Sequence, residues 1–256
     1  MEPDRSGQIA LLKVFLLVFV LGGWELGART GFIPTFWTSS PSLIAANFWK
    51  SLLANEISYH TWVTMQEALA GLAAGAVVGI LLGLLLGVSR VFGAALEPFV
   101  IALNSLPRVA LAPLIVMFVG IGFASKFLLA FSLVVVPIML NTYEGIKSVD
   151  PQLVNMMRVV HARRDQVFFK VLLPNCVPWI FSALRVSISF AIIGAIVGEF
   201  ISARAGIGYM IDTAAGGFDT TGMIMPLFVL MILAFALDRV FVAFSNRLLR
   251  WREDAR

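Results

Sequence analysis

Few residues of this sequence could take part in chemistry, and several of them lie inside long apolar runs. Arg108 falls near the middle of one such run, beside Asn104 and Ser105. An arginine in apolar surroundings is costly unless it is paired or hydrated. These three residues therefore predict either a place that attracts an anion or a structural arginine paired with a carbonyl or an acid.

Glu199 presents a similar choice near the end of a later apolar run. It can hold the glycine-rich segment that follows it, or it can line a gate, and we expect the structural role. Arg185, Asp238 and Arg239 are expected to pair with one another or to reach toward water rather than to bind a ligand.

Catalysis and metal binding are not predicted. His60 and His161 are isolated in the sequence and lack the helical spacing of metal ligands. The sequence has no Gly-x-x-x-x-Gly-Lys-Ser/Thr loop to hold the phosphates of ATP. It also offers only scattered charges, where an intramembrane enzyme needs a cluster of His, Asp or Ser groups. We therefore predict no catalytic residue, no metal site and no cofactor in this chain.

Composition defines the class of protein. Of 256 residues, 59% are hydrophobic and only 13% are charged, with a mean hydropathy of +0.92. Soluble domains carry about a quarter charged residues, so a soluble domain, a disordered chain and a nucleic-acid binder are excluded. Cys176 is the only cysteine, which excludes an intrachain disulfide. The composition predicts an all-α, polytopic membrane protein.

Six apolar runs are long enough, or nearly so, to cross a bilayer. The first resembles a signal peptide, but it is too long and lacks a small-residue cleavage site, so we expect it to remain as a span. The predicted spans are residues 9–26, 64–88, 96–122, 127–140, 176–201 and 222–244. Between the first two, residues 42–53 are predicted to form a short helix lying at the membrane interface.

Basic residues set the orientation of the spans. They gather in the polar segment 143–170 and in the carboxyl tail, including Arg250 and Arg252, and such residues accumulate on the cytoplasmic side. Both termini and this segment are therefore predicted to be cytoplasmic. The basic residues left near the outer face are Arg29, Lys50, Lys126 and Arg204.

Two spans have unusual backbone composition. Pro107 and Pro113 predict a kink in the third span, which should face the interior because exposed irregular backbone is not tolerated in lipid. The second span has a glycine every four residues, which predicts close helix packing. We expect that packing inside the subunit, with a dimer surface as the alternative. These glycines are Gly71, Gly75, Gly79, Gly83 and Gly87.

The polar segment contains a predicted short helix at residues 151–160. Asp150 can cap it, and Pro151 suits the first helical position. Its surface is largely apolar, so it either docks on a cytoplasmic partner or lies against the membrane interface. Its apolar residues are Leu153, Val154, Met156, Met157 and Val160. A second helix is predicted at residues 166–173, capped by Asp165 and ended by Pro174.

Several motifs occur in a fixed order and spacing after the glycine-rich second span. They are Leu106-Pro-Arg-Val-Ala-Leu-Ala-Pro, Gly145-Ile-Lys-Ser-Val-Asp-Pro-Gln-Leu, Gln166-Val-Phe-Phe-Lys-Val-Leu-Leu-Pro, Val197-Gly-Glu-Phe, Gly206-Ile-Gly-Tyr and Phe218-Asp-Thr. Together they cover about residues 61–252 and resemble the permeases of binding-protein-dependent ABC importers, most of all the nitrate, sulfonate and taurine branch. The family's Glu-Ala-Ala corresponds to Asn155-Met156-Met157, which removes a carboxylate, and its glycine corresponds to His161.

The resemblance implies a type I importer permease fold in the bacterial inner membrane. It divides the chain into residues 1–60, with the first span and a periplasmic interfacial segment, a permease core at 61–252 with a cytoplasmic coupling loop at 143–174, and a tail at 253–256. A second permease copy, two ATPase subunits that carry ATP and Mg, and a periplasmic or lipid-anchored binding protein are the implied partners. The implied ATPase-docking residues are Asp150, Pro151, Leu153, Asn155, Met156, Met157, Arg158 and His161, and the candidate pathway residues are Asn104, Ser105, Arg108 and Glu199.

The resemblance leaves the solute open. A small anion of the sulfonate, taurine or nitrate type is one expectation, and a vitamin or pyrimidine precursor carried by the same mechanism is the alternative. A secondary transporter or channel without an ATPase would show inverted repeats and a coupling-ion site, and no convincing repeat is present.

Overall fold

The computed structural model describes residues 4–248 of the chain, and within that range it is helical with no strand. The predicted tail 253–256, with Arg250 and Arg252, lies outside the described residues. The elements are α1 (Asp4–Arg29), α2 (Thr35–Thr38), α3 (Pro41–Leu53), α4 (Glu56–Val88), α5 (Arg90–Ser105), η1 (Arg108–Leu111), α6 (Ala112–Val119), α7 (Phe123–Lys147), α8 (Pro151–Val159), α9 (Arg164–Val167), η2 (Phe168–Leu172), α10 (Leu173–Ser202), α11 (Ile207–Gly216) and α12 (Thr220–Leu248).

Five of these helices are long and apolar enough to cross a membrane, and the bent pair α5 and η1–α6 would make a sixth span. The two halves of that pair meet at 76°. The break lies at Leu106 and Pro107, as the proline predicts. Pro113 plays a different part from the predicted one, because it stands in the first turn of α6 and begins that helix.

The glycine face of α4 packs against α7 in a regular register. A Cβ on Gly71 would touch Ala130, one on Gly79 would touch Ile138, and one on Gly87 would touch Ile146. Close packing inside the subunit is therefore confirmed. Residue numbers rise together on both helices, so α4 and α7 run parallel. The chain between them must then return across the same thickness, which makes α5 and α6 a single crossing and gives the predicted six spans.

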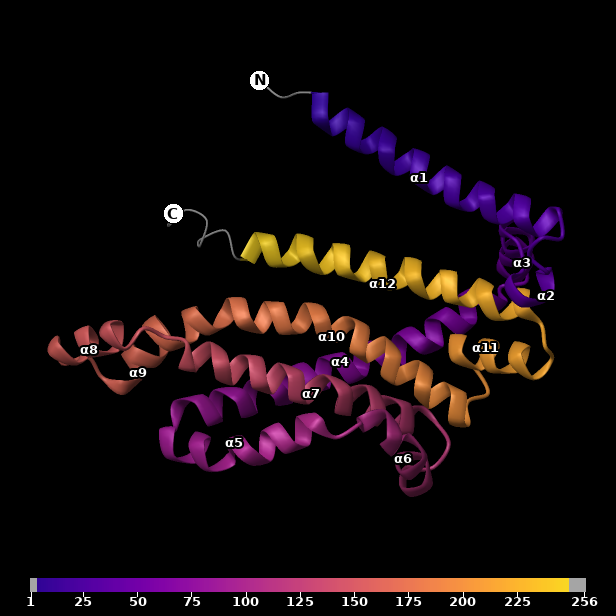
Figure 1. Cartoon of the computed structure of the whole chain (residues 1–256). Coiled ribbons are helices and arrows are strands. Elements are labelled where there is room, and N and C mark those ends of the chain that lie inside the picture. The colour runs from indigo at the N-terminus through magenta and orange to yellow at the C-terminus, as the bar shows by residue number, and fades with distance from the viewer. Residues whose placement is uncertain (1–3, 249–256) are drawn as a thin grey trace.

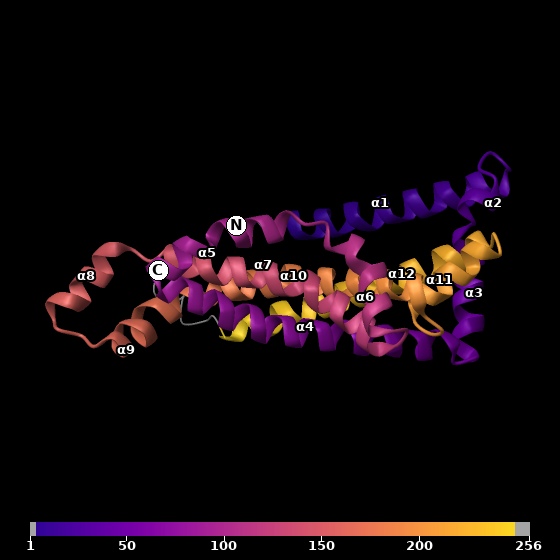
Figure 2. The same ribbon diagram turned by 90° about the horizontal axis from the view of Figure 1, so that it is seen from below.

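The central helix α7 also packs antiparallel to α10, where Gly194 approaches Ala130 and Gly198 approaches Lys126. Helices α4, α7 and α10 form the body of the molecule, and α1 and α12 are far less buried (Figure 1). Helix α1 begins, and α12 ends, toward the end of the molecule that carries α8. Helices α2, α3 and α11 lie at the opposite end (Figures 1 and 2). We refer to these as the α8 end and the α11 end.

Several predicted boundaries need correction. The fourth span, predicted at 127–140, is the whole of α7, because polar residues at its ends find partners and stay helical. The third span is longer at its start, since Ser89 caps α5 by accepting a hydrogen bond from Phe92 N. The short helix predicted at 42–53 is confirmed as α3, which lies across the direction of the long helices (Figure 2).

The second loop helix was predicted wrongly. Asp165 is not its cap, because the helix starts after Arg163, whose N–H donates to the Gln166 side chain at 2.9 Å. Pro174 does not end it either. The N–H of Leu173 donates to the Phe168 carbonyl five residues back, so a π turn carries the helix past the proline into α10.

Candidate functional site

Helix α8 begins and ends as its residues predict. The Asp150 carboxylate accepts a hydrogen bond from Gln152 N at 2.8 Å, and Pro151 occupies the first turn. After the helix, His161 adopts a φ of +54°, in the left-handed region. His161 therefore takes a conformation that glycine adopts without strain and that histidine tolerates less easily.

One side of α8 is an exposed apolar stripe. Leu153, Met156 and Val160 are spaced three and four residues apart, so they share one face, and they are 50%, 65% and 71% exposed. Val154 and Met157 are partly buried. Met157 is therefore less available for docking than predicted. We call Leu153, Met156 and Val160 the α8 stripe.

The remaining predicted docking residues lie beside the stripe. Asn155 and Arg158 are exposed, and Arg158 Nη1 lies 3.5 Å from Asn155 Oδ1. Helix α8 projects beyond the ends of the long helices, so its exposed apolar residues do not pack against the spans (Figures 1 and 2). No part of residues 4–248 covers the stripe, so its apolar surface is open to an external partner.

Arg108 is held by oxygens of its own chain. Its Nη1 donates to the carbonyls of Ser132, at 3.0 Å, and Leu133, at 3.4 Å. Its Nη2 donates to Asn104, at 2.9 Å to Oδ1 and at 3.4 Å to the carbonyl. Pro137 lies inside α7 and has no N–H, so the carbonyl of Leu133 four residues earlier lacks its helical donor. Arg108 supplies that donor and ties the break in the third span to the proline of α7.

The other candidate pathway residues surround this break. Asn104 and Ser105 are exposed in the single chain, and Ser105 Oγ donates to the Ile101 carbonyl at 3.1 Å. The segment around the break was expected to face the interior. In this chain it is instead exposed, with Leu106 46% exposed, so protein or water from outside the chain must cover it in a membrane.

Glu199 holds the glycine-rich turn between α10 and α11. Its Oε1 accepts from Thr64 Oγ1 at 2.7 Å, and its Oε2 accepts from Gly208 N at 2.5 Å. Thr64 Oγ1 in turn accepts from Ile207 N at 2.8 Å. Gly206 has a φ of +116°, and a Cβ there would overlap the Glu199 carboxylate, so only glycine fits. Glu199 therefore lies in a structural cluster far along the sequence from Arg108.

Sequence reasoning missed two members of that cluster. Glu67 and Lys126 are buried and paired, with Lys126 Nζ 3.2 Å from Glu67 Oε1. Lys126 does lie at the α11 end, as predicted, but it faces inward. The spacing of the sequence could have revealed them. Gly71 and Ala130 form the first contact of the regular packing between α4 and α7, and Glu67 and Lys126 each lie four residues before one of these two residues.

Other charged residues behave as expected. Arg185 Nε lies 2.7 Å from Asp238 Oδ1, and Arg185 Nη2 lies 3.0 Å from Oδ2, which makes a two-point pair between α10 and α12. The guanidinium of Arg239 lies 4.8 Å from the centre of the Phe235 ring. No group of three or more His, Cys, Asp or Glu side chains that could hold a metal ion occurs among the residues described.

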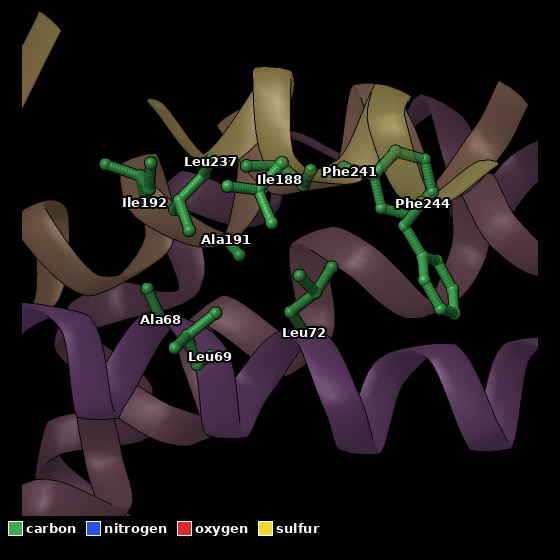
Figure 3. A pocket seen from close by; sticks show the side chains of 10 residues that line it. Ala68, Leu69, Leu72, Ile188, Ala191, Ile192, Leu237, Phe241 and Phe244 are labelled. Carbon is green, nitrogen blue, oxygen red and sulfur yellow. The ribbon is translucent and has the colours of Figure 1, made fainter. Parts of the chain in front are cut away.

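Two cavities differ in character. One, of about 260 Å³, lies between α4, α10 and α12 and has an entirely apolar lining that includes Leu72, Ile188 and Phe241 (Figure 3). It offers no polar group to orient a hydrophilic solute. The other, of about 420 Å³ at the α11 end, is lined by residues of α3, α4, α11, α12 and the turn before α12, and the polar residues His60 and Asp219 are among them.

Residues 75–250, well over half of the chain, match the binding-protein-dependent transport system inner membrane component family. The chain belongs to this family of ABC transporter permeases. The loop that carries α8 and the break at Arg108 both fall inside the matched part of the permease.

Individual relatives of the permease cover nearly its whole length. It is 37% identical to the riboflavin transport system permease RibX of Chloroflexus aurantiacus, over 93% of this chain and 87% of the relative. It is 31% identical to the formylaminopyrimidine transport permease ThiX of Halalkalibacterium halodurans, over 93% and 94%. It is also 31% identical to a protein named as the aliphatic sulfonates transport permease SsuC of Escherichia coli, over 97% and 95%.

The fold of the permease has a counterpart among solved structures. The methionine ABC transporter MetNI, in an inward-facing conformation, aligns with a TM-score of 0.63 at 21% identity, over 78% of this chain and 95% of that one. The type I importer permease fold predicted from the sequence is therefore confirmed, and the chain is a multi-pass membrane protein.

Proposed function

We propose that this permease forms the translocation pathway of an ATP-driven importer of the bacterial inner membrane, and that separate ATPase subunits drive it through α8. The observation that carries the proposal is the α8 stripe. An apolar face that projects from the α8 end, with no cover from residues 4–248, is suited to a groove on a partner. ATP and Mg would be bound by that partner.

The pathway is proposed to lie between two copies of the chain. The break at Leu106 and Pro107 has irregular backbone that lipid does not tolerate, and in the single chain it is exposed. A second copy facing it across a watery path would cover it and would bring the exposed Asn104 and Ser105 to that path. A periplasmic or lipid-anchored binding protein would deliver solute at the α11 end.

Docking on an ATPase is tested by one substitution and one matched control. Met156→Asp places a charge in the stripe, while Val91→Asp places the same charge on an exposed residue at the start of α5, also at the α8 end. Losing a buried methionine contact costs about 2 kcal/mol, which is about a 30-fold weaker Kd. We expect Met156→Asp to weaken binding of the co-expressed ATPase by at least that factor and Val91→Asp to leave it unchanged.

An equal affinity for both variants would contradict docking through α8. Nucleotide dependence separates the proposal from a secondary transporter or channel. Proteoliposomes that hold only this chain should move no solute along an ion gradient, and transport in the full complex should stop without ATP.

For the solute, we propose a small vitamin or pyrimidine precursor ahead of a sulfonate, taurine or nitrate. One basis of the anion expectation was Arg108, whose two terminal nitrogens already donate to four oxygens of the chain. Relatives named for riboflavin and formylaminopyrimidine support the precursor class, and the relative named for aliphatic sulfonates supports the other. Ligand binding to the cognate binding protein, measured by calorimetry with both classes, decides between them.

A further inference from the structure

The buried cluster at the α11 end has unequal numbers of acids and bases. Glu67 and Glu199 are 2% and 1% exposed, and Lys126 is 6% exposed. With both acids ionised, these groups sum to one negative charge inside the protein. A buried charge without a counter-charge is among the costliest features a fold can contain. A hydrogen ion bound by one of the two acids would remove it.

The contacts of Glu199 are those of an ionised carboxylate. Both of its oxygens accept hydrogen bonds, one from Thr64 Oγ1 and one from Gly208 N. Thr64 Oγ1 accepts from Ile207 N, and its hydroxyl hydrogen points at Glu199 Oε1, at 2.7 Å, in preference to the His60 carbonyl, at 3.2 Å. Backbone amides and a hydroxyl that converge on a carboxylate stabilise its negative charge.

Glu67 has the complementary pattern. Its Oε1 lies 3.2 Å from Lys126 Nζ, whereas its Oε2 is buried with no donor within reach. Glu67 and Glu199 belong to the same cluster, because Thr64, one turn before Glu67 on α4, donates to Glu199, and Gly198, next to Glu199 on α10, packs against Lys126. As a carboxylate, Oε2 would face a second anion with no compensation. As a hydroxyl, the same atom becomes the donor that this position lacks.

The surrounding groups leave this assignment unchanged. From α7, the charged group that faces the acids is Lys126, whose Nζ lies 3.2 Å from Glu67 Oε1. On α4, His60 Nδ1 accepts from Gly206 N at 2.9 Å, so this nitrogen carries no hydrogen and the imidazole is neutral. Helix α11 and the turn before it contribute backbone amides. His60 also lines the polar cavity at the α11 end, which places a polar, open region next to the cluster.

We propose that Glu67, Lys126 and Glu199 form a buried proton-binding site, with the proton on Glu67 Oε2 and directed at Glu199. The bound proton leaves one ammonium and one carboxylate, so the cluster is neutral. It also fixes Glu199 where Thr64 and Gly208 reach it, which holds the turn between α10 and α11 against α4 and α7. Loss of the proton sets two anions side by side and weakens the hold of Glu199 on Gly208.

Infrared spectroscopy of the purified full-length protein tests the site directly. At neutral pH, the wild type should show the carbonyl-stretch band of a protonated carboxylic acid, and Glu67→Gln should lose it. Glu97→Gln, which removes an exposed acid paired with Lys147, should keep the band. Lys126→Met should strengthen the band, because the cluster then needs two protons to be neutral.

Absence of the band in the wild type, or its persistence in Glu67→Gln, would overturn the proposal. Thermal unfolding gives a second readout. Glutamine at position 67 reproduces a neutral acid, with an N–H for Glu199 and an oxygen for Lys126, so Glu67→Gln should unfold at the wild-type temperature. Glu199→Gln should unfold earlier. A loss of stability in Glu67→Gln as large as that in Glu199→Gln would show that both acids must be charged, against the proposal.

Discussion

Substitution of Gly83 by alanine tests the packing of α4 on α7 most sharply. A Cβ at Gly83 would lie 2.5 Å from Thr142 Cβ and 2.6 Å from the carbonyl oxygen of Met139. Non-bonded carbon atoms prefer about 3.5–4.0 Å, so the helices would have to separate by about 1 Å. The carbonyl belongs to the helix backbone and cannot rotate away. Over-packing of this kind costs about 1–3 kcal/mol.

Alanine also has a higher helix propensity than glycine, by about 1 kcal/mol per residue. The measurement therefore needs a control substitution that gains helix propensity without over-packing. Gly22→Ala on α1 provides it, because a Cβ there meets nothing within 4 Å. The assay is the free energy of unfolding of the purified protein in mixed micelles. We expect Gly83→Ala to be less stable than Gly22→Ala by about 1–3 kcal/mol. Equal stabilities of the two variants would refute the close contact of α4 with α7.

Further predictions concern single polar contacts. Arg108→Gln should lower the free energy of unfolding by about 1–3 kcal/mol, because the Leu133 carbonyl loses its donor, and an unchanged value would contradict the role given to Arg108. Arg185→Asp should destabilise the protein by leaving two acids together, and adding Asp238→Arg should restore stability in the same unfolding assay. His161→Gly should keep ATPase binding and raise stability by about 0.5–1 kcal/mol, whereas His161→Ala should lower it; equal effects of the two variants would rule out a left-handed turn.

The sequence predicted the spans and the register of the core because both depend on periodic features. Hydropathy runs locate helices, and a glycine every fourth residue can face only one side. The same four-residue periodicity includes Glu67, which precedes Gly71 by one repeat. Extending the repeat to this acid would have placed Glu67 in the interface between α4 and α7. Lys126 could not be assigned from its own position, since a lysine at the end of a span is usually solvated.

Other features depend on contacts that no local pattern contains. The bonds from Arg108 to α7 join residues 24 and 25 positions apart, and they depend on a proline in the second helix. The π turn before Pro174 is similar, because a proline alone predicts a break, whereas the bond from the Leu173 N–H to the Phe168 carbonyl carries the helix past it. These features required the three-dimensional structure.

The glycine register has a mechanical consequence. The glycine face of α4 lies directly against the backbone and side chains of α7, so the two helices have little room to slide or roll and should move as one rigid unit. At the α8 end, Asn175 Nδ2 donates to the Gly145 carbonyl at 3.0 Å and to Ser148 Oγ at 3.1 Å. These bonds join α10 to the same rigid unit. At the far end, Glu199 on α10 grips the turn before α11. A tilt imposed on the loop that carries α8 would therefore be transmitted through this unit to the turn before α11. The α8 end and the α11 end would move in opposite directions.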